Sequence, residues 1–367
     1  MIEQQSHVPK VPLSRRFIGW IKHHQVWSLI ILGVILIAIT GGIATALLLQ
    51  KPKPIVAAPI HKPKPKPAPI VYYSLLDGTK VSSAADQTAP VTGIMIENSP
   101  DARPQSGLKQ AQVVYEAIAE GGITRFLALY QQNKPQLIGP VRSVRLYDLD
   151  YLAPYQAGLA HVGGSMQALQ TIRSGGAWRD LDEFFNGSYY WRSTDRYAPH
   201  NVYTSFAKLD ALNQAKGYTS STFTSFPRID AAPSAAPNAS QVTINFSSAL
   251  YNTSYQWDKG CDCYARSQAG APHLDREDGQ ITPAVVVALH VDETTILQDG
   301  YREQVTTTGT GEADIFQNGT ATKATWRKDS QTAPLELIDG SGKAIPLIRG
   351  QTWIAVVPNN GGSISWQ

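Results

Sequence analysis

The chain has 367 residues and a formal net charge of +3, a length that suggests two folded units plus extra segments. Residues 1–70 hold nine lysines and arginines against one acid, a balance of +8, so residues 71–367 sum to −5. A mildly acidic folded part argues against a nucleic-acid partner, because neutralising phosphates requires a broad positive surface. Any anion site must therefore be a local pocket.

Residues 26–49 contain no charged side chain. As a helix rising about 1.5 Å per residue, this run is long enough to cross the roughly 30 Å hydrocarbon core of a bilayer. We predict an uncleaved, single-pass anchor in the cell membrane, with the basic tail 1–25 in the cytoplasm and the folded modules outside. The alternative is a cleaved signal peptide, because the Ala-Thr-Ala triplet at 44–46 resembles a cleavage site, although it lies inside the apolar run.

Residues 50–70 are rich in proline and lysine, which is typical of an extended spacer of about 3.1 Å per residue. We predict a stalk between the membrane and the folded part. Its lysines could contact anionic lipid or an anionic cell-wall polymer, and a solvated stalk without a binding role is the alternative.

Residues 71–224 alternate strand-like and helix-like patterns, which predicts an α/β module with a mixed sheet. We expect a strand over 91–99, then either a helix or a short helix running into a strand over 107–122. A strand hairpin is predicted within Glu120–Asp150, pairing Ile123–Tyr130 with Leu137–Leu146. Helices are expected after Asp148, from Ser165, and after a cap at Thr204 or Ser205.

Residues 225–240 resemble a linker, and 241–367 consist of short apolar or alternating runs separated by glycine-containing turns. This pattern predicts a smaller, β-rich C-terminal module. The cysteines, Cys261 and Cys263, form no disulfide framework for the fold; they are either reduced or bridged locally. Two thiolates without a matching Cys/His pair make a poor zinc signature, so we predict no metal site there.

Ten polar residues of the α/β module are not explained by hydrophobic packing: Glu97, Arg103, Glu120, Arg125, Arg142, Arg145, Asp148, His161, His200 and Asn201. The planar fork of arginine binds phosphate or carboxylate through paired hydrogen bonds. We therefore predict that these residues form a ligand-binding site, without assigning catalytic roles. The alternative is that the charged residues form internal ion pairs and that the histidine at 161 is a packed core residue.

A Ser-His-Asp arrangement of Ser165, His161 and Asp148 is a further alternative. It lacks the Gly-x-Ser-x-Gly turn that exposes the nucleophile in hydrolases of the α/β class.

Eight segments carry a resemblance to a known family: IENSPDARPQSGL, VVYEAIAEGGITRFLALY, IGPVRSVRLYD, HVGGS, PHNVYT, FQNG, TWRKD and GQTWIAVVP. Together they resemble the YerB-like family of proposed bacterial lipoproteins, over nearly all of 80–360. The resemblance implies an envelope-attached, extracytoplasmic protein with an N-terminal and a C-terminal module and no assigned reaction. The sequence lacks the lipobox cysteine of a lipoprotein, since its cysteines stand at 261 and 263, so the anchor would be the helix.

The strand order and the Arg-x-x-Arg-x-x-Asp segment that ends at Asp148 are also similar to the LytR-CpsA-Psr family. Those enzymes transfer glycans from polyprenyl pyrophosphate to the cell wall, with arginines and a divalent metal. This likeness implies a phosphotransferase in which Asp148 or Glu97 helps to bind Mg²⁺. The Pro-Arg-Asp segment of that family is replaced here by Ser143-Val144-Arg145.

Three hypotheses on function result. The first is binding of an anionic glycan or phosphate-bearing ligand, such as a cell-wall polymer or a lipid-linked glycan, through the arginine-lined site. The second is the metal-assisted phosphotransferase, the only case in which Mg²⁺ is expected as a cofactor. The third is a scaffold that binds another envelope protein through its β module, and it explains the aromatic loop Tyr189-Tyr190-Trp191 as well as the other two hypotheses do.

Overall fold

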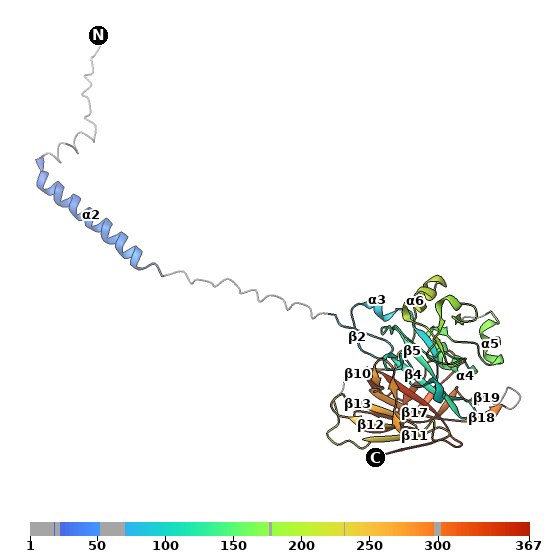
Figure 1. Ribbon diagram of the computed structural model, residues 1–367. Helices are drawn as coiled ribbons and strands as arrows, with labels where there is room; N and C mark the ends of the chain where they lie inside the picture. Colours follow the sequence, from blue (N-terminus) through green and yellow to red (C-terminus); the bar gives the residue numbers. More distant parts are fainter. Residues whose placement is uncertain (1–17, 19–22, 52–69, 176–177, 231, 297–301) are drawn as a thin grey trace, which may run out of the picture. The chain divides into compact units, whose positions relative to one another are not determined.

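The computed structural model describes residues 18, 23–51, 70–175, 178–230, 232–296 and 302–367 (Figure 1). The chain divides into one unit over Met1–Ala68 and a second over Pro69–Gln367. Most of the predicted basic tail and stalk lies outside the described residues.

The first unit contains the helix α2 (Gln25–Leu48), close to the predicted span 26–49. This helix is long and apolar enough to cross a membrane, and none of its residues is buried by the protein. Within this helix the Thr40 hydroxyl donates to the Leu36 carbonyl at 2.8 Å, so that hydroxyl does not need a water molecule as partner.

The largest sheet among the described residues has 12 strands and is mixed. Ten of them form its main path, in the spatial order β22 (Glu336–Ile338), β21 (Thr320–Lys328), β20 (Gly309–Gln317), β17 (Val285–Val291), β24 (Thr352–Pro358), β4 (Val113–Glu120), β5 (Ile123–Tyr130), β3 (Thr92–Glu97), β6 (Gly158–Ala160) and β7 (Arg179–Asp180). The hairpin of β18 (Glu293–Ile296) and β19 (Arg302–Val305) joins it next to β4. Mixed α/β order followed by a β-rich region confirms the predicted fold class.

The sheet runs through both predicted modules without a break. Strand β24, from the C-terminal region, lies parallel to β4, with Thr352 opposite Val113 and Ala355 opposite Glu116. On its other side β24 lies parallel to β17. The two regions therefore share one backbone hydrogen-bond ladder.

A second, five-stranded sheet has the order β14 (Ala271–Pro272), β13 (Cys263–Gln268), β12 (Thr253–Asp258), β11 (Gln241–Asn245) and β25 (Ser363–Trp366). Short strand pairs are β1 (Tyr72–Tyr73) with β2 (Lys80–Val81), β8 (Trp191–Arg192) with β9 (Val202–Tyr203), β10 (Arg228–Ile229) with β23 (Leu347–Ile348), and β15 (Leu274–Asp275) with β16 (Gly279–Gln280). The helices of this unit are α3 (Ala84–Gln87), α4 (Leu146–Leu152), α5 (Met166–Arg173) and α6 (Phe206–Ala215), with single 3₁₀ turns at Pro100–Ala102, Leu108–Gln110, Ala153–Tyr155 and Gly187–Tyr189.

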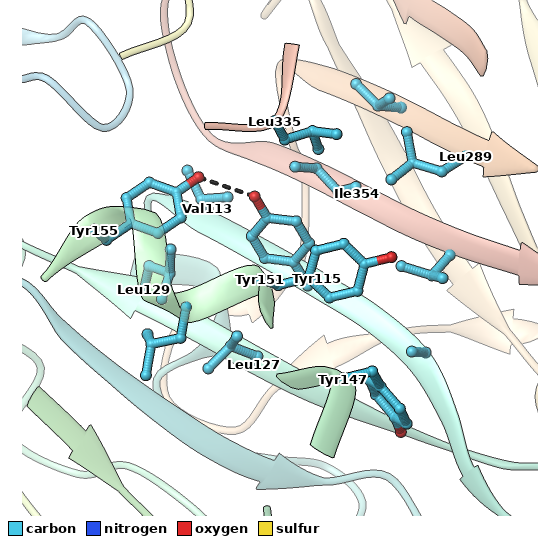
Figure 2. Close-up of a cluster of buried hydrophobic side chains, with 14 of the residues drawn as sticks. Val113, Tyr115, Leu127, Leu129, Tyr147, Tyr151, Tyr155, Leu289, Leu335 and Ile354 are labelled. Atoms are coloured by element: carbon cyan, nitrogen blue, oxygen red, sulfur yellow. Dashed lines mark hydrogen bonds between the residues drawn. The ribbon is translucent and has the colours of Figure 1, made fainter. Parts of the chain in front are cut away.

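The two faces of the large sheet bury separate apolar cores. One face packs against α4 and α5, and its core joins side chains of both regions, among them Val113, Tyr115 and Ile354. Figure 2 shows this core, in which the Tyr115 and Tyr155 hydroxyls lie 2.9 Å apart and satisfy each other. The other face packs against α6 and the second sheet.

The predicted hairpin has a different partner strand in the structure. Strand β5 pairs with the preceding β4 across Gly121 and Gly122, whose positive φ angles suit a two-residue hairpin turn. The segment 137–145 makes only isolated bridges, such as Ile96 with Val141. Pro140 offers no N–H to a ladder, and the helix α4 begins at Leu146, so the second strand of the predicted hairpin was wrong.

Other local predictions hold. Strand β3 lies within 91–99, and 107–122 forms a 3₁₀ turn running into β4, the second of the two alternatives. Ser205 is the N-cap of α6 and accepts from the Lys208 N–H. Cys261 and Cys263 form a disulfide, so neither thiolate is available to a metal.

A fully buried ion pair crosses the contact between the two regions. Glu116 on β4 accepts from Arg266 on β13 at 2.8 Å, with neither side chain exposed. The Trp353 indole N–H donates to the same carboxylate oxygen at 2.9 Å, and Thr124 donates to the other at 3.0 Å. Every oxygen of the buried carboxylate therefore has a donor.

Replacing Glu116 by Gln should destabilise the protein by about 3–5 kcal/mol, because the Arg266 charge would stay buried without a counter-charge. Urea unfolding of the purified protein, followed by tryptophan fluorescence, measures this. The matched control is Glu336→Gln, which breaks the half-exposed pair with Arg327 and should change the midpoint little. If the two substitutions lowered the free energy of unfolding equally, the buried pair would not be more important for stability than the half-exposed one, which would contradict this prediction.

Candidate functional site

A cleft of about 670 Å³ opens where three turns of the second unit meet. The turn after β3, the loop between β8 and β9, and the β15–β16 turn contribute its lining, which is Asp101, Arg103, Pro104, Asp195, Arg196, Tyr197, Ala198, His200 and Arg276. We call it the arginine cleft.

Asn201 fixes the shape of the β8–β9 loop. Its side-chain amide donates to the carbonyls of Ser193 and Arg196, at 3.1 and 3.3 Å, and its oxygen accepts from Arg192 at 2.9 Å. These bonds close the loop that carries His200 into the cleft. Asn201 is thus a positioning residue, next to the cleft lining and not part of it.

Arg103 and Arg196 are held by neutral acceptors. Arg103 donates to the Asn98 side chain at 3.1 Å and to the carbonyls of Asn98 and Leu250 at 2.8 and 2.9 Å. Arg196 donates to the carbonyls of Asp101 and Pro104, at 2.7 and 2.5 Å. Within the described part of the chain neither guanidinium has a carboxylate partner within 4 Å. Burial lowers the pKa of Arg103.

Arg276, by contrast, is already paired. Its guanidinium lies 2.5 Å from the Asp195 carboxylate, and this bond raises the pKa of Arg276. Asp195 also accepts from the Ser193 hydroxyl, and the two donors hold its pKa below the ordinary value, Ser193 having the larger effect. The cleft lining therefore holds three arginines against two carboxylates, Asp101 and Asp195, and of the three only Arg276 is paired with one of them.

His200 is bound from behind by a buried carboxylate. Its Nδ1 lies 2.9 Å from Oε1 of Glu97, whose side chain is 4 % exposed, whereas the His200 side chain is 23 % exposed. Ser99 donates to the same Glu97 oxygen at 2.9 Å. The second oxygen of Glu97 lies 3.3 Å from Arg142 Nε, a charge contact outside hydrogen-bond geometry.

Four other predicted residues form a separate cluster beside α4. The Glu120 carboxylate binds Arg125 at 3.0 Å through one oxygen and Arg145 through the other. Burial alone would raise the pKa of Glu120, but the two arginines outweigh it and hold the pKa below its ordinary value. The Arg145 side chain is only 6 % exposed, so its charge is compensated within the protein by Glu120.

Asp148 completes that cluster by capping α4. One carboxylate oxygen accepts from the Arg145 backbone N–H at 2.7 Å. Burial raises the pKa of Asp148 to about 7, against this hydrogen bond and the nearby arginines, which act to lower it.

His161 is a core residue in the structure. It is fully buried, with Nδ1 2.8 Å from the Gly163 carbonyl and Nε2 3.1 Å from the Asp180 carboxylate. Ser165 caps α5 by accepting from the Ala168 N–H. Both ring nitrogens are engaged elsewhere, so the Ser-His-Asp arrangement is wrong.

The structure thus brings together Glu97, Arg103, Arg142 and His200 at or directly behind the arginine cleft, with Asn201 shaping its loop. It does not bring Glu120, Arg125, Arg145, Asp148 or His161 into the cleft. Sequence reasoning missed Arg196 and Arg276. Arg196 stands four residues before His200 in a turn-rich segment, and this proximity could have identified it as a candidate site residue. Arg276 belongs to a hairpin turn far along the chain, and nothing in the sequence around it indicates a site.

Comparison with known proteins gives matches in two parts of the chain. Residues 76–219 match the family model described as "Protein of unknown function (DUF3048) N-terminal domain", and 242–354 match the corresponding C-terminal domain. The chain is 34 % identical over 293 residues to "Putative lipoprotein YerB" of Bacillus subtilis (strain 168), covering 77 % of this chain and 86 % of that protein. The crystal structure of YerB from Bacillus subtilis is similar, with a TM-score of 0.71, 29 % identity, and coverage of 80 % of this chain and 99 % of that one.

Replacing Asp148 by Asn should remove a pH dependence of stability. A carboxyl whose pKa rises from 3.8 to about 7 on folding stabilises the protein fully below pH 3.8 and loses that contribution as the pH rises through 7. Relative to wild type, the variant should gain on the order of 2 kcal/mol between pH 5 and pH 8. Denaturant unfolding at each pH measures this, with the more exposed Asp210→Asn as control. A difference in unfolding free energy between the variant and the wild type that stayed constant over this pH range would contradict the prediction.

Proposed function

Because the chain belongs to the YerB-like family of proteins with DUF3048 N- and C-terminal domains, whose models assign no activity, we propose a function from the geometry of the arginine cleft. The apolar helix α2 and this family membership support membrane association in the cell envelope. The proposed function is binding of an anionic glycan or another phosphate-bearing ligand in the cleft.

One observation carries this proposal. Arg103 and Arg196 are fixed by carbonyl groups, which orient a guanidinium without neutralising it. Because neither guanidinium is paired with a carboxylate, each keeps a positive charge and donor groups that an anion in the cleft can bind. Phosphate suits these forked donors because it accepts two hydrogen bonds from one arginine.

The cleft is also larger than a phosphate group requires. Its volume of about 670 Å³ lies within the range of small-molecule sites. The Tyr197 ring in its lining is 92 % exposed. An exposed aromatic face beside two arginines suits a ligand that joins a sugar ring to a phosphate, as in a cell-wall polymer or a lipid-linked glycan.

The phosphotransferase alternative would use the same phosphate chemistry with Mg²⁺ bound by Glu97 or Asp148. Of these two, Glu97 lies behind the cleft, and Asp148 caps α4 in the other cluster. The proposed ligand therefore lies next to His200, with Glu97 behind that histidine, and we assign no position to Mg²⁺.

The exposure of the aromatic side chains bears on the scaffold alternative. Tyr190 of the predicted aromatic loop is buried, with its hydroxyl donating to the Leu181 carbonyl, so this ring is not available to a partner. Phe184 and Phe185, just before that loop, are 69 % and 68 % exposed. A protein partner in the envelope would therefore be sought at these two phenylalanines.

Replacing Arg196 by Gln should weaken binding of inorganic pyrophosphate about tenfold or more, because a charge-assisted hydrogen bond contributes about 1.5–3 kcal/mol. Isothermal titration calorimetry at low salt measures this, and added NaCl should weaken binding to the wild type. Arg196→Lys keeps the charge and should retain part of the affinity. Arg327→Gln, which alters an arginine outside the cleft lining, should bind like wild type. Absence of wild-type binding would contradict the proposed function.

We further propose that the N-terminus lies in the cytoplasm and that residues 71–367 lie outside the membrane. Protease added to intact spheroplasts should then remove an epitope at the C-terminus and leave one at the N-terminus. Membrane pellets should retain the whole chain after washing with alkaline carbonate. Recovery of the folded part in the soluble fraction, shortened at its N-terminus, would instead indicate a cleaved signal peptide.

A further inference from the structure

His200 occupies a place in the arginine cleft that anion binding alone does not require. Its Nδ1 is held by the buried Glu97, and it lines the cleft from the β8–β9 loop. The other ring nitrogen, Nε2, has no hydrogen-bond partner within the described part of the chain. The histidine thus has one nitrogen fixed by the protein and one without a protein partner.

This arrangement determines the chemistry of the ring. A carboxylate can only accept at Nδ1, so the neutral imidazole carries its proton there and leaves a lone pair at Nε2. The same carboxylate stabilises the imidazolium that forms when Nε2 takes a proton. Ser99 lies on the Nδ1 side, 3.2 Å from that nitrogen, and binds Glu97. Ser99 therefore helps to fix the pair and is not placed to attack a ligand through Nε2.

From this geometry, and resting on the proposed function of the cleft, we propose that the protein hydrolyses a phosphate ester, with His200 as the general base. Water from the solvent attacks the phosphorus atom, and its proton passes to Nε2 of His200. The new P–O bond forms as the bond to the leaving alcohol breaks. The alcohol oxygen takes a proton from solvent, and the imidazolium returns its proton to solvent.

The guanidiniums of Arg103 and Arg196 serve this step as well as binding. Negative charge moves onto the phosphoryl oxygens and the leaving oxygen as the bond breaks, and fixed positive donors stabilise that change without reorganising. Arg103 and Arg196 line the same cleft as His200 and are already held in position. Glu97 is a positioning residue in this scheme, since it acts through the imidazole.

The full-length protein in detergent should hydrolyse p-nitrophenyl phosphate or bis(p-nitrophenyl) phosphate, measured by release of p-nitrophenolate, and both probes are tested to separate monoester from diester. His200→Gln should reduce turnover about 100-fold or more, the usual contribution of a general base, whereas its effect on pyrophosphate binding should be much smaller than that of Arg196→Gln. The matched control is His290→Gln, since His290 also bonds a carboxylate, Asp314 at 3.0 Å, but lies outside the cleft lining. This control should retain wild-type turnover.

Glu97→Gln gives a second test that does not depend on removing the histidine. It keeps an acceptor for Nδ1 but loses the negative charge that stabilises the imidazolium, so kcat should fall while KM changes little. A purely structural role of Glu97 would disturb the cleft and would raise KM as well.

The outcomes separate this inference from the proposed function. Binding of pyrophosphate without turnover of either probe by the wild type would overturn hydrolysis and leave the binding function standing. Full turnover by a folded His200→Gln variant would also overturn the role of the histidine. Failure of the wild type to bind pyrophosphate at all would contradict both proposals.

Discussion

The buried ion pair of Glu116 and Arg266 is the interaction on which the arrangement of the second unit depends. Each charge would be costly alone in the core, and together they require the large sheet and the second sheet to meet in one register. Arg266 also packs over the Trp353 ring, 4.4 Å from its centre, and donates to Tyr255 at 3.2 Å. An ion pair with these additional contacts specifies a geometry as well as contributing free energy.

The same pair is connected to the arginine cleft through hydrogen bonds. Glu116 accepts from Thr124, Thr124 accepts from Asn98 at 2.6 Å, and Asn98 accepts from Arg103. A parallel route runs from Arg266 through His273 to Gln105, whose carbonyl accepts from the Arg276 N–H. Burial, and secondarily Arg266, hold the pKa of His273 well below its ordinary value, so this histidine stays neutral and can accept from Arg266. The cleft is therefore rigidly supported by core residues of both regions.

The sequence allowed the fold class and most local elements to be predicted, because strand alternation and caps are local signals. The capping role of Ser205 and the strand at 92–97 are examples. The partner of β5 was mispredicted because Gly121 and Gly122 could equally have been read as a helix end, and only tertiary pairing decides between the two. The outcome for the candidate site residues also depended on sequence distance. Arg125 and Glu120, which lie close together in the sequence, form an internal ion pair. The cleft instead combined residues that lie up to 175 positions apart, Asp101 and Arg276, a separation at which sequence patterns carry no signal.

The position of β24 has a consequence for how the chain acquires its structure. This strand lies between β17 and β4 in the middle of the large sheet, yet it comes from residues 352–358, later in the chain than every other strand of the sheet's main path. Until those residues arrive, β4 lacks its parallel neighbour and the sheet is divided into two parts with unpaired edges. Contacts between such distant segments form slowly, because the loop between them must close first. The core of the second unit is therefore complete only once residues 352–358 are available, and its open sheet edges would need protection from aggregation until then.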